Sequence, residues 1–163
     1  MSFLSMELKY ALVILGISMT PVLELRGSIP YGAAIGLPAW ETIILSVIGN
    51  MLLTPLIIIS VRKVFDWLKS KKIFRRFAEW SEKHVMEKRD VLEKYEIIGL
   101  AVLVAVPLPG TGAWTGAMLA GLLGMRLKKA LPPIFIGVLI AAVVVGGVSY
   151  GFLEALDFIG VHA

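Results

Sequence analysis

The chain has 163 residues, which is enough for one compact domain. Apolar residues make up 58% of it and charged residues 17%, whereas soluble domains average about 45–50% and about 25%. A mean hydropathy of +0.85 excludes a disordered chain and argues against a water-soluble domain.

The charged residues are concentrated in one segment. Residues 62–96 contain 11 of the 16 Lys and Arg and 7 of the 12 Asp and Glu, leaving ten charged residues for the rest of the chain. The net charge of +4 therefore comes from this segment, and its acids nearly match its bases. A nucleic-acid partner would need an unmatched basic face. The pattern predicts an integral membrane protein with one charged segment.

Two apolar runs are long enough to cross a bilayer as helices, which takes about 20 residues. They are Trp40–Val61 and Leu131–Leu153. Four other apolar runs are too short to span. They cover about 8–20, 28–37, 97–106 and 113–125.

The short runs form two pairs, each flanking a break rich in Gly and Pro. The breaks are residues 20–30 (TPVLELRGSIP) and 107–114 (PLPGTGAW). A short helix, a broken tip and a second short helix predict a re-entrant hairpin, which enters the membrane and returns to the same side. A single kinked spanning helix at each place is the alternative.

The placement of basic residues favours the hairpins. Residues 62–96 lack Gly and Pro and repeat apolar residues at helical spacing, which predicts an amphipathic cytoplasmic segment by the positive-inside rule. If residues 97–123 crossed the membrane, the next basic cluster, Arg126, Lys128 and Lys129, would lie outside. If they form a hairpin, the cluster returns to the cytoplasm.

These elements predict an all-α membrane protein built from two inverted repeats. Residues 1–61 form the first hairpin and span, residues 62–96 the linker, and residues 97–163 the second hairpin, span and tail. The hairpins would enter from opposite faces, so that their tips meet near the midplane, where many transporters bind substrate. Small residues every four positions predict close helix packing, with stripes at Ser28/Gly32/Gly36, Ala113/Ala117/Gly121 and Gly116/Ala120/Gly124.

Glu24 and Arg26 are the central candidates for function. Ionisable side chains at membrane depth are costly, and they persist where they pair, line a cavity or bind a ligand. Arg26 presents a planar fork of donors suited to phosphate or carboxylate. Glu24 either neutralises Arg26 or exchanges a proton. The alternative is an ion pair at a shallow loop that only fixes topology.

Other candidates lie around the same two tips. Pro21, Pro30, Pro107 and Pro109 interrupt helices, and Gly27, Gly110 and Gly112 allow turns and close approach of a ligand. Ser28, Thr111 and Thr115 supply hydroxyls, and Trp114 either stacks on a ligand or packs across to the other hairpin. Asn50 interrupts the first span, and we expect it to hydrogen-bond a hairpin.

Residues for enzymatic chemistry are missing from the pattern. The chain has no Cys, its two His lie at positions 84 and 162, and no Asp/Glu/His cluster has metal-ligand spacing. No nucleophile elbow is present. We therefore expect no enzyme, no catalytic residue, no metal and no cofactor.

At both tips the sequence resembles the small multidrug export proteins of prokaryotic membranes. The residues that carry the resemblance are Glu24–Gly32 (ELRGSIPYG) and Pro107–Gly116 (PLPGTGAWTG). The layout also looks, more loosely, like the DedA superfamily. Proteins of that superfamily have paired re-entrant hairpins and are linked to undecaprenyl phosphate recycling and lipid scrambling, so this resemblance implies a lipid-phosphate substrate. DedA-type proteins carry arginines at the second hairpin, whereas residues 106–116 have no charge.

Three functions follow from these observations. The first is a secondary carrier or flippase for an amphiphilic anionic substrate such as a polyprenyl phosphate, with Arg26 as the anion contact. The second is a proton-coupled exporter of hydrophobic cations that uses Glu24. The third is a non-transporting scaffold that docks through residues 62–96. We also expect a homodimer, because two hairpins and two spans form too thin a bundle to cover Gly27 and Gly110, and Gly147 and Gly151 could form its contact.

Overall fold

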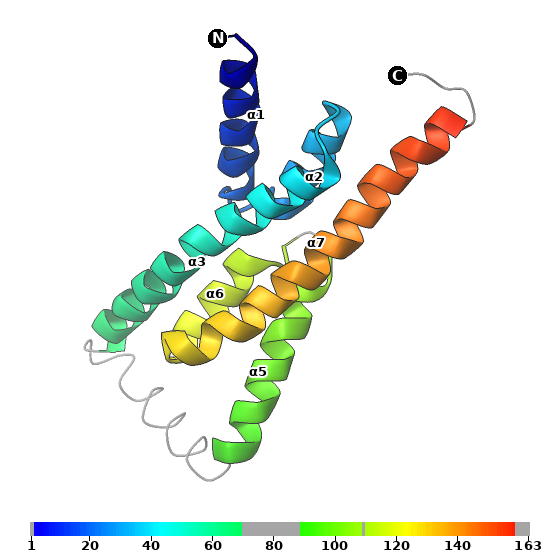
Figure 1. Ribbon diagram of the computed structural model, residues 1–163. Helices are drawn as coiled ribbons and strands as arrows, with labels where there is room; N and C mark the ends of the chain where they lie inside the picture. The colour runs from blue at the N-terminus through cyan, green and yellow to red at the C-terminus, as the bar shows by residue number, and fades with distance from the viewer. Residues whose placement is uncertain (1, 70–88, 109, 159–163) are drawn as a thin grey trace.

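The computed structural model describes residues 2–69, 89–108 and 110–158, and all regular structure in these ranges is helical (Figure 1). The helices are α1 (Ser2–Ser18), α2 (Glu24–Ala34), α3 (Ala39–Lys69), α5 (Arg89–Ala105), α6 (Ala113–Leu122) and α7 (Leu127–Phe158). The all-α prediction is confirmed.

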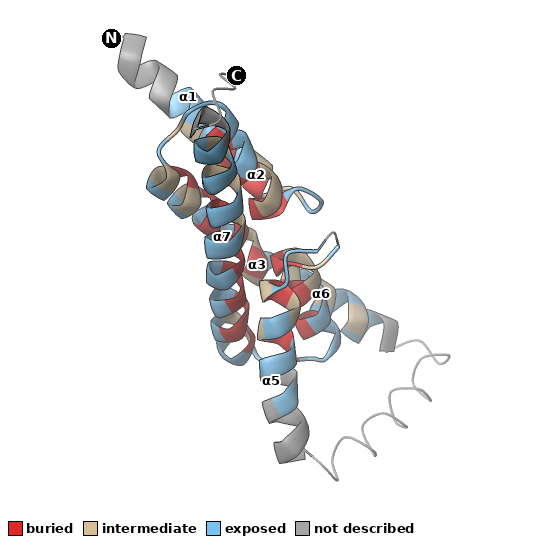
Figure 2. Ribbon diagram, turned by 90° about the vertical axis from the view of Figure 1, so that its right-hand side faces the viewer, coloured by how far each residue is buried: buried red, intermediate tan, exposed pale blue. Residues whose placement is uncertain are grey.

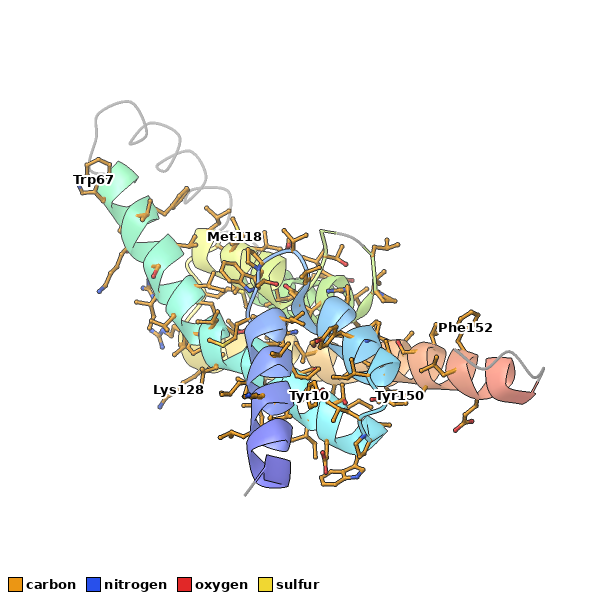
Figure 3. All side chains as sticks on the ribbon, turned by 90° about the horizontal axis from the view of Figure 1, so that it is seen from above. Tyr10, Trp67, Met118, Lys128, Tyr150 and Phe152 are labelled. Carbon is orange, nitrogen blue, oxygen red and sulfur yellow. The ribbon has the colours of Figure 1, made fainter. Side chains whose placement is uncertain are left out.

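The two predicted spans are the two long helices. Within the described ranges, Ala39–Trp67 of α3 and Leu127–Ala155 of α7 are each 29 residues long and apolar enough to cross a bilayer. In Figure 1 the two long helices run in opposite senses. Seen from above, Trp67 of α3 and Phe152 of α7 lie at opposite ends of the molecule (Figure 3).

Helix α3 has the side-chain distribution of a helix that faces lipid. One face exposes large apolar side chains at four-residue spacing: Ile44, Ile48, Leu52 and Leu56, each between 48% and 59% exposed. The opposite face buries polar side chains at the same spacing: Thr42, Ser46, Asn50 and Thr54, none more than 1% exposed. A soluble helix has the reverse arrangement. Figure 2 shows the exposed outer faces of the long helices, which bilayer hydrocarbon would cover.

The short helices form two hairpins that pack on the long helices. Helix α1 packs on α2, and α5 packs on α6. Figure 1 shows the α1–α2 hairpin at the end of the molecule with the N-terminus, while the α5–α6 hairpin enters from the opposite end. Each second arm also contacts both long helices, so that α2 lies between α3 and α7, and α6 does likewise. The two breaks therefore meet in the middle of the bundle.

Both second arms end in the same way. Gly36 and Gly124 follow α2 and α6 with φ of 74° and 65°, values that favour glycine. The amides of Leu37 and Met125 then donate to the carbonyls of Gly32 and Ala120, which closes a Schellman motif at each end. The third residue after each glycine starts a long helix. These glycines are turn residues, and the prediction that they belong to close-packed stripes is wrong, since no atom lies within 4 Å of the position of an added Cβ.

The other stripe glycines do permit close contacts between helices. An added Cβ on Gly32 would meet Thr42 of α3, and one on Gly121 would lie 2.8 Å from Val61 of α3. One on Gly116 would lie 2.5 Å from Val104 of α5. Small residues therefore set the approach of α2 and α6 to their neighbours, as the sequence predicts.

The first break is shorter than predicted. It covers residues 19–23, and α2 begins at Glu24, so Arg26, Gly27, Ser28 and Pro30 are helical. The apolar run in the sequence begins only at about residue 28, several residues after the start of α2, because the first turn of this helix contains charged and small residues of low hydropathy. Pro30 remains inside α2, on an exposed face of the helix.

The charged linker is only partly described. Residues 62–69 continue α3 and residues 89–96 belong to α5, so both ends of the predicted linker extend neighbouring helices. The amphipathic helix predicted between them, including Phe74, lies outside the described residues.

Candidate functional site

Arg26 joins the two hairpin tips. Its Nη1 donates to Glu24 Oε2 at 2.9 Å, within α2. Its Nη2 donates across the bundle to the carbonyl of Val106 at 2.8 Å and to the Thr111 hydroxyl at 3.3 Å, both in the link between α5 and α6. The guanidinium is thus divided between a charge on its own hairpin and neutral acceptors on the other.

Glu24 makes the reciprocal link. Its carboxylate is buried, and Oε1 accepts a hydrogen bond of 2.9 Å from the backbone amide of Trp114, in the first turn of α6. Gly112, at the N-cap of α6, provides no side-chain cap, so Glu24 supplies from another helix the negative charge that a helix N-terminus favours. Glu24 has a φ of 48°, the one positive φ outside glycine among the described residues. This left-handed strain is typical of functional sites.

Gly112 fits the space left by this ion pair. A Cβ added at Gly112 would overlap Glu24 Oε2 and Arg26 Nη1. Its φ of 149° also lies in a region that other residues rarely adopt. Both constraints require glycine at this position.

At the second tip, threonine hydroxyls form hydrogen bonds with backbone carbonyls of the same tip. The Thr111 hydroxyl contacts the carbonyls of Val106 and Leu108 at 2.7 and 2.9 Å, and the Thr115 hydroxyl donates to the carbonyl of Gly110 at 2.7 Å. The two threonines therefore stabilise the loop that presents acceptors to Arg26.

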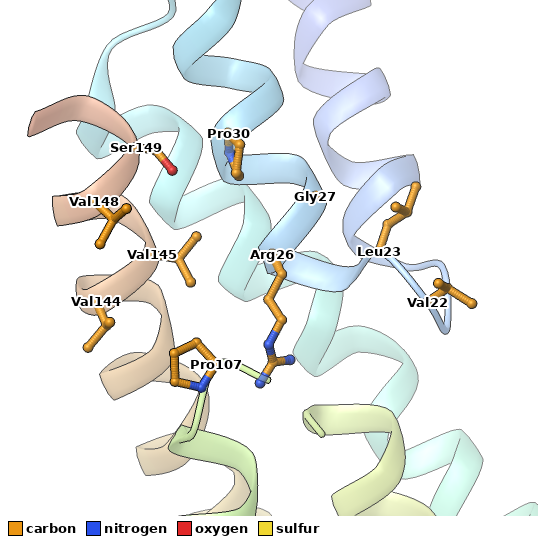
Figure 4. Close-up of a pocket in the computed structure, with 10 residues that line it drawn as sticks. All are labelled: Val22, Leu23, Arg26, Gly27, Pro30, Pro107, Val144, Val145, Val148 and Ser149. Atoms are coloured by element: carbon orange, nitrogen blue, oxygen red, sulfur yellow. The ribbon is translucent and has the colours of Figure 1, made fainter. Parts of the chain in front are cut away.

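A cavity of about 460 Å³ opens beside Arg26, between α2 and α7 (Figure 4). Ligand pockets in proteins commonly have volumes of about 300–1,000 Å³. Its walls are mostly apolar, and Arg26 is its one charged residue. The lining residues are Val22, Leu23, Arg26, Gly27, Pro30, Pro107, Val144, Val145, Val148 and Ser149. Glu24 does not line it.

A second hollow of about 260 Å³ continues this cavity along the same two helices. The two share Pro30, Val148 and Ser149, and the second extends to Ala34 of α2 and Leu153 of α7. Together they form a groove between α2 and α7, with Arg26 toward the centre of the bundle and apolar residues at the other end.

The structure brings together only part of the predicted site. Glu24, Arg26, Thr111, Gly112 and Trp114 meet at the tips, and Gly27 and Pro107 line the cavity. Three other predicted residues lie apart. Ser28 donates to Ser46 on α3, Thr115 bonds within its own loop, and Gly110 is exposed with open space around it. Pro109 lies outside the described residues.

The α7 wall of the cavity was not predicted from the sequence. Val144, Val145, Val148 and Ser149 lie within a uniformly apolar run, so nothing in their residue types separates them from the lipid-facing side chains beside them. The Trp114 ring does not line the cavity. Ser149 is the single polar residue in this wall and the only available signal.

Buried polar atoms without a hydrogen-bond partner occur at the tips and on α3. Among the described residues they are Arg26 Nε, Trp114 Nε1 and both polar atoms of the Asn50 side chain. The structure contradicts the expectation that Asn50 hydrogen-bonds a hairpin. Buried polar atoms usually have partners, so such a group of exceptions needs a functional explanation.

Metal-ligating residues do not cluster here. Within the ranges that the structure describes, no group of three or more His, Cys, Asp or Glu could hold a metal ion. The chemistry of the tips is that of one ion pair, backbone groups and hydroxyls.

Comparison with known proteins identifies the family. A family model described as "Putative small multi-drug export protein" matches residues 24–144. This match covers well over half of the chain. The chain belongs to this small multidrug export family.

The match to the small multidrug export family begins at Glu24 and runs through α3, both arms of the second hairpin and more than half of α7. It includes every contact of the Glu24–Arg26 pair described above. The sequence resemblance to this family is confirmed, and together with the outer faces of α3 and α7 it makes the chain a membrane protein. The looser DedA resemblance has no counterpart in the match, and no curated protein or solved structure matches the chain.

Proposed function

We propose that this member of the small multidrug export family is a membrane carrier that moves an amphiphilic, anionic substrate across or between the leaflets. The observation that carries the proposal is the apolar cavity with one charged residue, Arg26, at the junction of two broken helices. Apolar walls suit the body of an amphiphile, and an arginine fork suits a phosphate or carboxylate headgroup.

We further propose that the two halves are inverted repeats whose hairpins are re-entrant. Helix, break, helix and long helix occur in this order twice, and both second arms end in the same glycine motif. The contacts also correspond, because each second arm packs on both long helices. In carriers of this design, movement of one repeat against the other exposes a central site to each side in turn.

This topology places residues 62–96 in the cytoplasm. Arg62 and Lys63 near the end of α3 and Lys128 and Lys129 at the start of α7 then lie on one side of the membrane, the cytoplasmic side by the positive-inside rule. The protein would be a multi-pass protein of the cell membrane, with α3 and α7 as its two full crossings.

The headgroup contact is Arg26. Its Nε has no partner, and its fork is held in part by weaker neutral acceptors, the Thr111 hydroxyl at 3.3 Å and the carbonyl of Val104 at 3.4 Å. An anionic oxygen from the cavity would replace these long contacts with shorter hydrogen bonds in which both the donor and the acceptor are charged. A lipid phosphate such as a polyprenyl phosphate has the required headgroup, and its chain suits the α2–α7 groove.

The cationic alternative fits the geometry less well. Export of hydrophobic cations needs a carboxylate that faces the substrate, but both oxygens of Glu24 are occupied, by Trp114 and Arg26, and Glu24 does not line the cavity. A cation in the cavity would meet the arginine.

A binding experiment separates the two substrate classes. We expect purified protein in a maltoside detergent to bind decyl phosphate and not decyltrimethylammonium, and Arg26→Gln to abolish the binding. Arg126→Gln is the matched control, because it removes an exposed cation far from the cavity. Preferential binding of the ammonium compound, or decyl phosphate binding that Arg26→Gln leaves unchanged, would reverse the assignment.

A transport experiment separates a carrier from a scaffold. Liposomes that contain the protein and a fluorescent lipid phosphate would be exposed to an impermeant quencher. We expect quenching to pass beyond the outer leaflet with the intact protein and to stop there with Arg26→Gln. If transport is absent with every candidate lipid, while deletion of residues 70–90 alone abolishes function in cells, the scaffold would be correct.

A further inference from the structure

The buried polar face of α3 contains one side chain that its surroundings do not explain. Three of its four residues have partners. Thr42 accepts from the Tyr150 hydroxyl at 3.0 Å, Ser46 accepts from Ser28 at 2.6 Å, and the Thr54 hydroxyl donates to the Asn50 carbonyl at 2.8 Å. The Asn50 side chain is 1% exposed, and neither its oxygen nor its nitrogen has a hydrogen-bond partner.

An unpaired, buried carboxamide destabilises a protein, whereas an apolar side chain of the same shape would not. Leucine would fill this position without loss of any hydrogen bond that the structure shows. An asparagine here therefore points to a partner that this arrangement of side chains does not supply.

The packing of α2 on α3 shows which group lies at the level of Asn50. Gly32 of α2 lies against Thr42 of α3, and one turn earlier on α2, Ser28 bonds Ser46, one turn later on α3. The two helices thus pair in antiparallel register. One further turn in the same direction reaches Glu24 on α2 and Asn50 on α3.

We propose that Asn50 is the second hydrogen-bond partner of the Glu24 carboxylate, which takes the place of Arg26 when a ligand engages that arginine. The trigger rests on the proposed function, in which an anionic headgroup binds Arg26. Glu24 then loses the donor to its Oε2 while it remains buried, and the α2–α3 register predicts the unpaired Asn50 amide one turn beyond the Ser28–Ser46 contact, on the side of Glu24.

The exchange leaves the other link of Glu24 intact. Oε1 keeps the amide of Trp114 at the start of α6, so the carboxylate stays at that helix N-terminus while Oε2 turns from Arg26 toward α3. No proton is taken up or released. Asn50 is thus a positioning residue that lowers the cost of freeing Arg26 for a headgroup.

A double-mutant cycle without ligand tests the partnership directly. In the natural background, Asn50→Leu should leave the unfolding temperature in detergent unchanged or raise it. In the Arg26→Gln background, where Glu24 depends on Asn50, the same substitution should lower that temperature by several degrees. Thr54→Val is the matched control, because Thr54 bonds only its own helix and should have equal effects in both backgrounds. If Arg26→Gln does not fold, the binding measurement with Glu24→Gln described below tests the partnership instead.

An equal effect of Asn50→Leu in both backgrounds would overturn the proposal. A second measurement tests the trigger. Asn50→Leu should weaken decyl phosphate binding about tenfold, the equivalent of one hydrogen bond to a charged group, but should cause no further loss in a Glu24→Gln background. A loss that persists in that background would show that Asn50 acts without Glu24. If the natural protein does not bind decyl phosphate, the proposed function is wrong, and the ligand-free cycle alone decides the role of Asn50.

Discussion

Glu24 of α2 accepts a hydrogen bond of 2.9 Å from the backbone amide of Trp114 of α6, 90 positions further along the chain. Through this bond a charged side chain of the first hairpin completes the start of a helix in the second. Arg26 makes the opposite connection, to the carbonyl of Val106. The two hairpins are therefore held tip to tip by one carboxylate and one guanidinium, and the guanidinium also borders the cavity proposed to hold substrate.

The first prediction concerns the stability of the ion pair. Arg26→Gln should destabilise the protein by up to about 3–5 kcal/mol, because it leaves the buried Glu24 carboxylate without its partner, and Glu24→Gln should destabilise it less, because the Arg26 side chain is partly exposed. The double variant should lose much less than the sum. Reversible unfolding in mixed micelles measures all four proteins. Additive losses would show that the two charges act independently.

The second prediction tests the close approach at Gly112. Gly112→Ala should destabilise the protein as strongly as loss of the ion pair, since its Cβ would displace both charged side chains. Gly99→Ala on α5 is the control, because open space surrounds that position and alanine favours a helix. Equal thermal stability of the two variants would mean that the tips do not meet as the structure shows.

The third prediction fills the cavity without changing its charge. Val148→Trp should block decyl phosphate binding, because Val148 lines both parts of the α2–α7 groove. Val143→Trp, on the same helix, is the control, since Val143 is as exposed as Val148 (70% against 68%) but does not line the groove. If both variants bind equally well, the substrate site lies elsewhere.

The sequence was sufficient to predict the two long helices, the two breaks and the residues that meet there, because each leaves a local signal. Length and hydropathy mark α3 and α7, and Pro, Gly and isolated charges mark the breaks. The partners of those residues could not be predicted. Nothing local shows that Glu24 completes the start of α6, since that contact depends on how α2 and α6 pack between the long helices.

The lining of the cavity and the lack of a partner for Asn50 could not be predicted from the sequence either. Val148 lines the groove and Val143 does not, yet the two have the same residue type within one apolar run and are almost equally exposed. Asn50 is conspicuous in the sequence, and its lack of a partner emerges only when every neighbour is placed. Helix packing, rather than composition, determines both properties.

The fourth prediction concerns topology. The chain contains no Cys, so single cysteines can be introduced without background labelling. In intact cells, an impermeant thiol reagent should label Pro38→Cys, in the link between α2 and α3, but neither Lys63→Cys nor Lys128→Cys until the membrane is opened. Labelling of Pro38→Cys and Lys128→Cys from the same side would exclude α3 as a single crossing between them.

The fifth prediction is a homodimer, and the structure alters the argument for it. Gly110 was expected to leave backbone facing lipid, but its carbonyl accepts a hydrogen bond from Thr115. The α2–α7 groove remains open along one side of the bundle, and Gly147 and Gly151 on α7 are exposed, with no neighbouring atom near an added Cβ. A second copy packed at these glycines would approach closely beside the groove.

Native mass measurement in mild detergent should therefore give twice the chain mass of 17.7 kDa. Gly147→Leu and Gly151→Leu should shift the protein toward monomer, because each places a bulky side chain where backbones would meet. Gly16→Leu on α1 is the control, since its surroundings are equally open and it lies on a different helix. A monomer that binds decyl phosphate with full affinity would show that one chain forms the complete site.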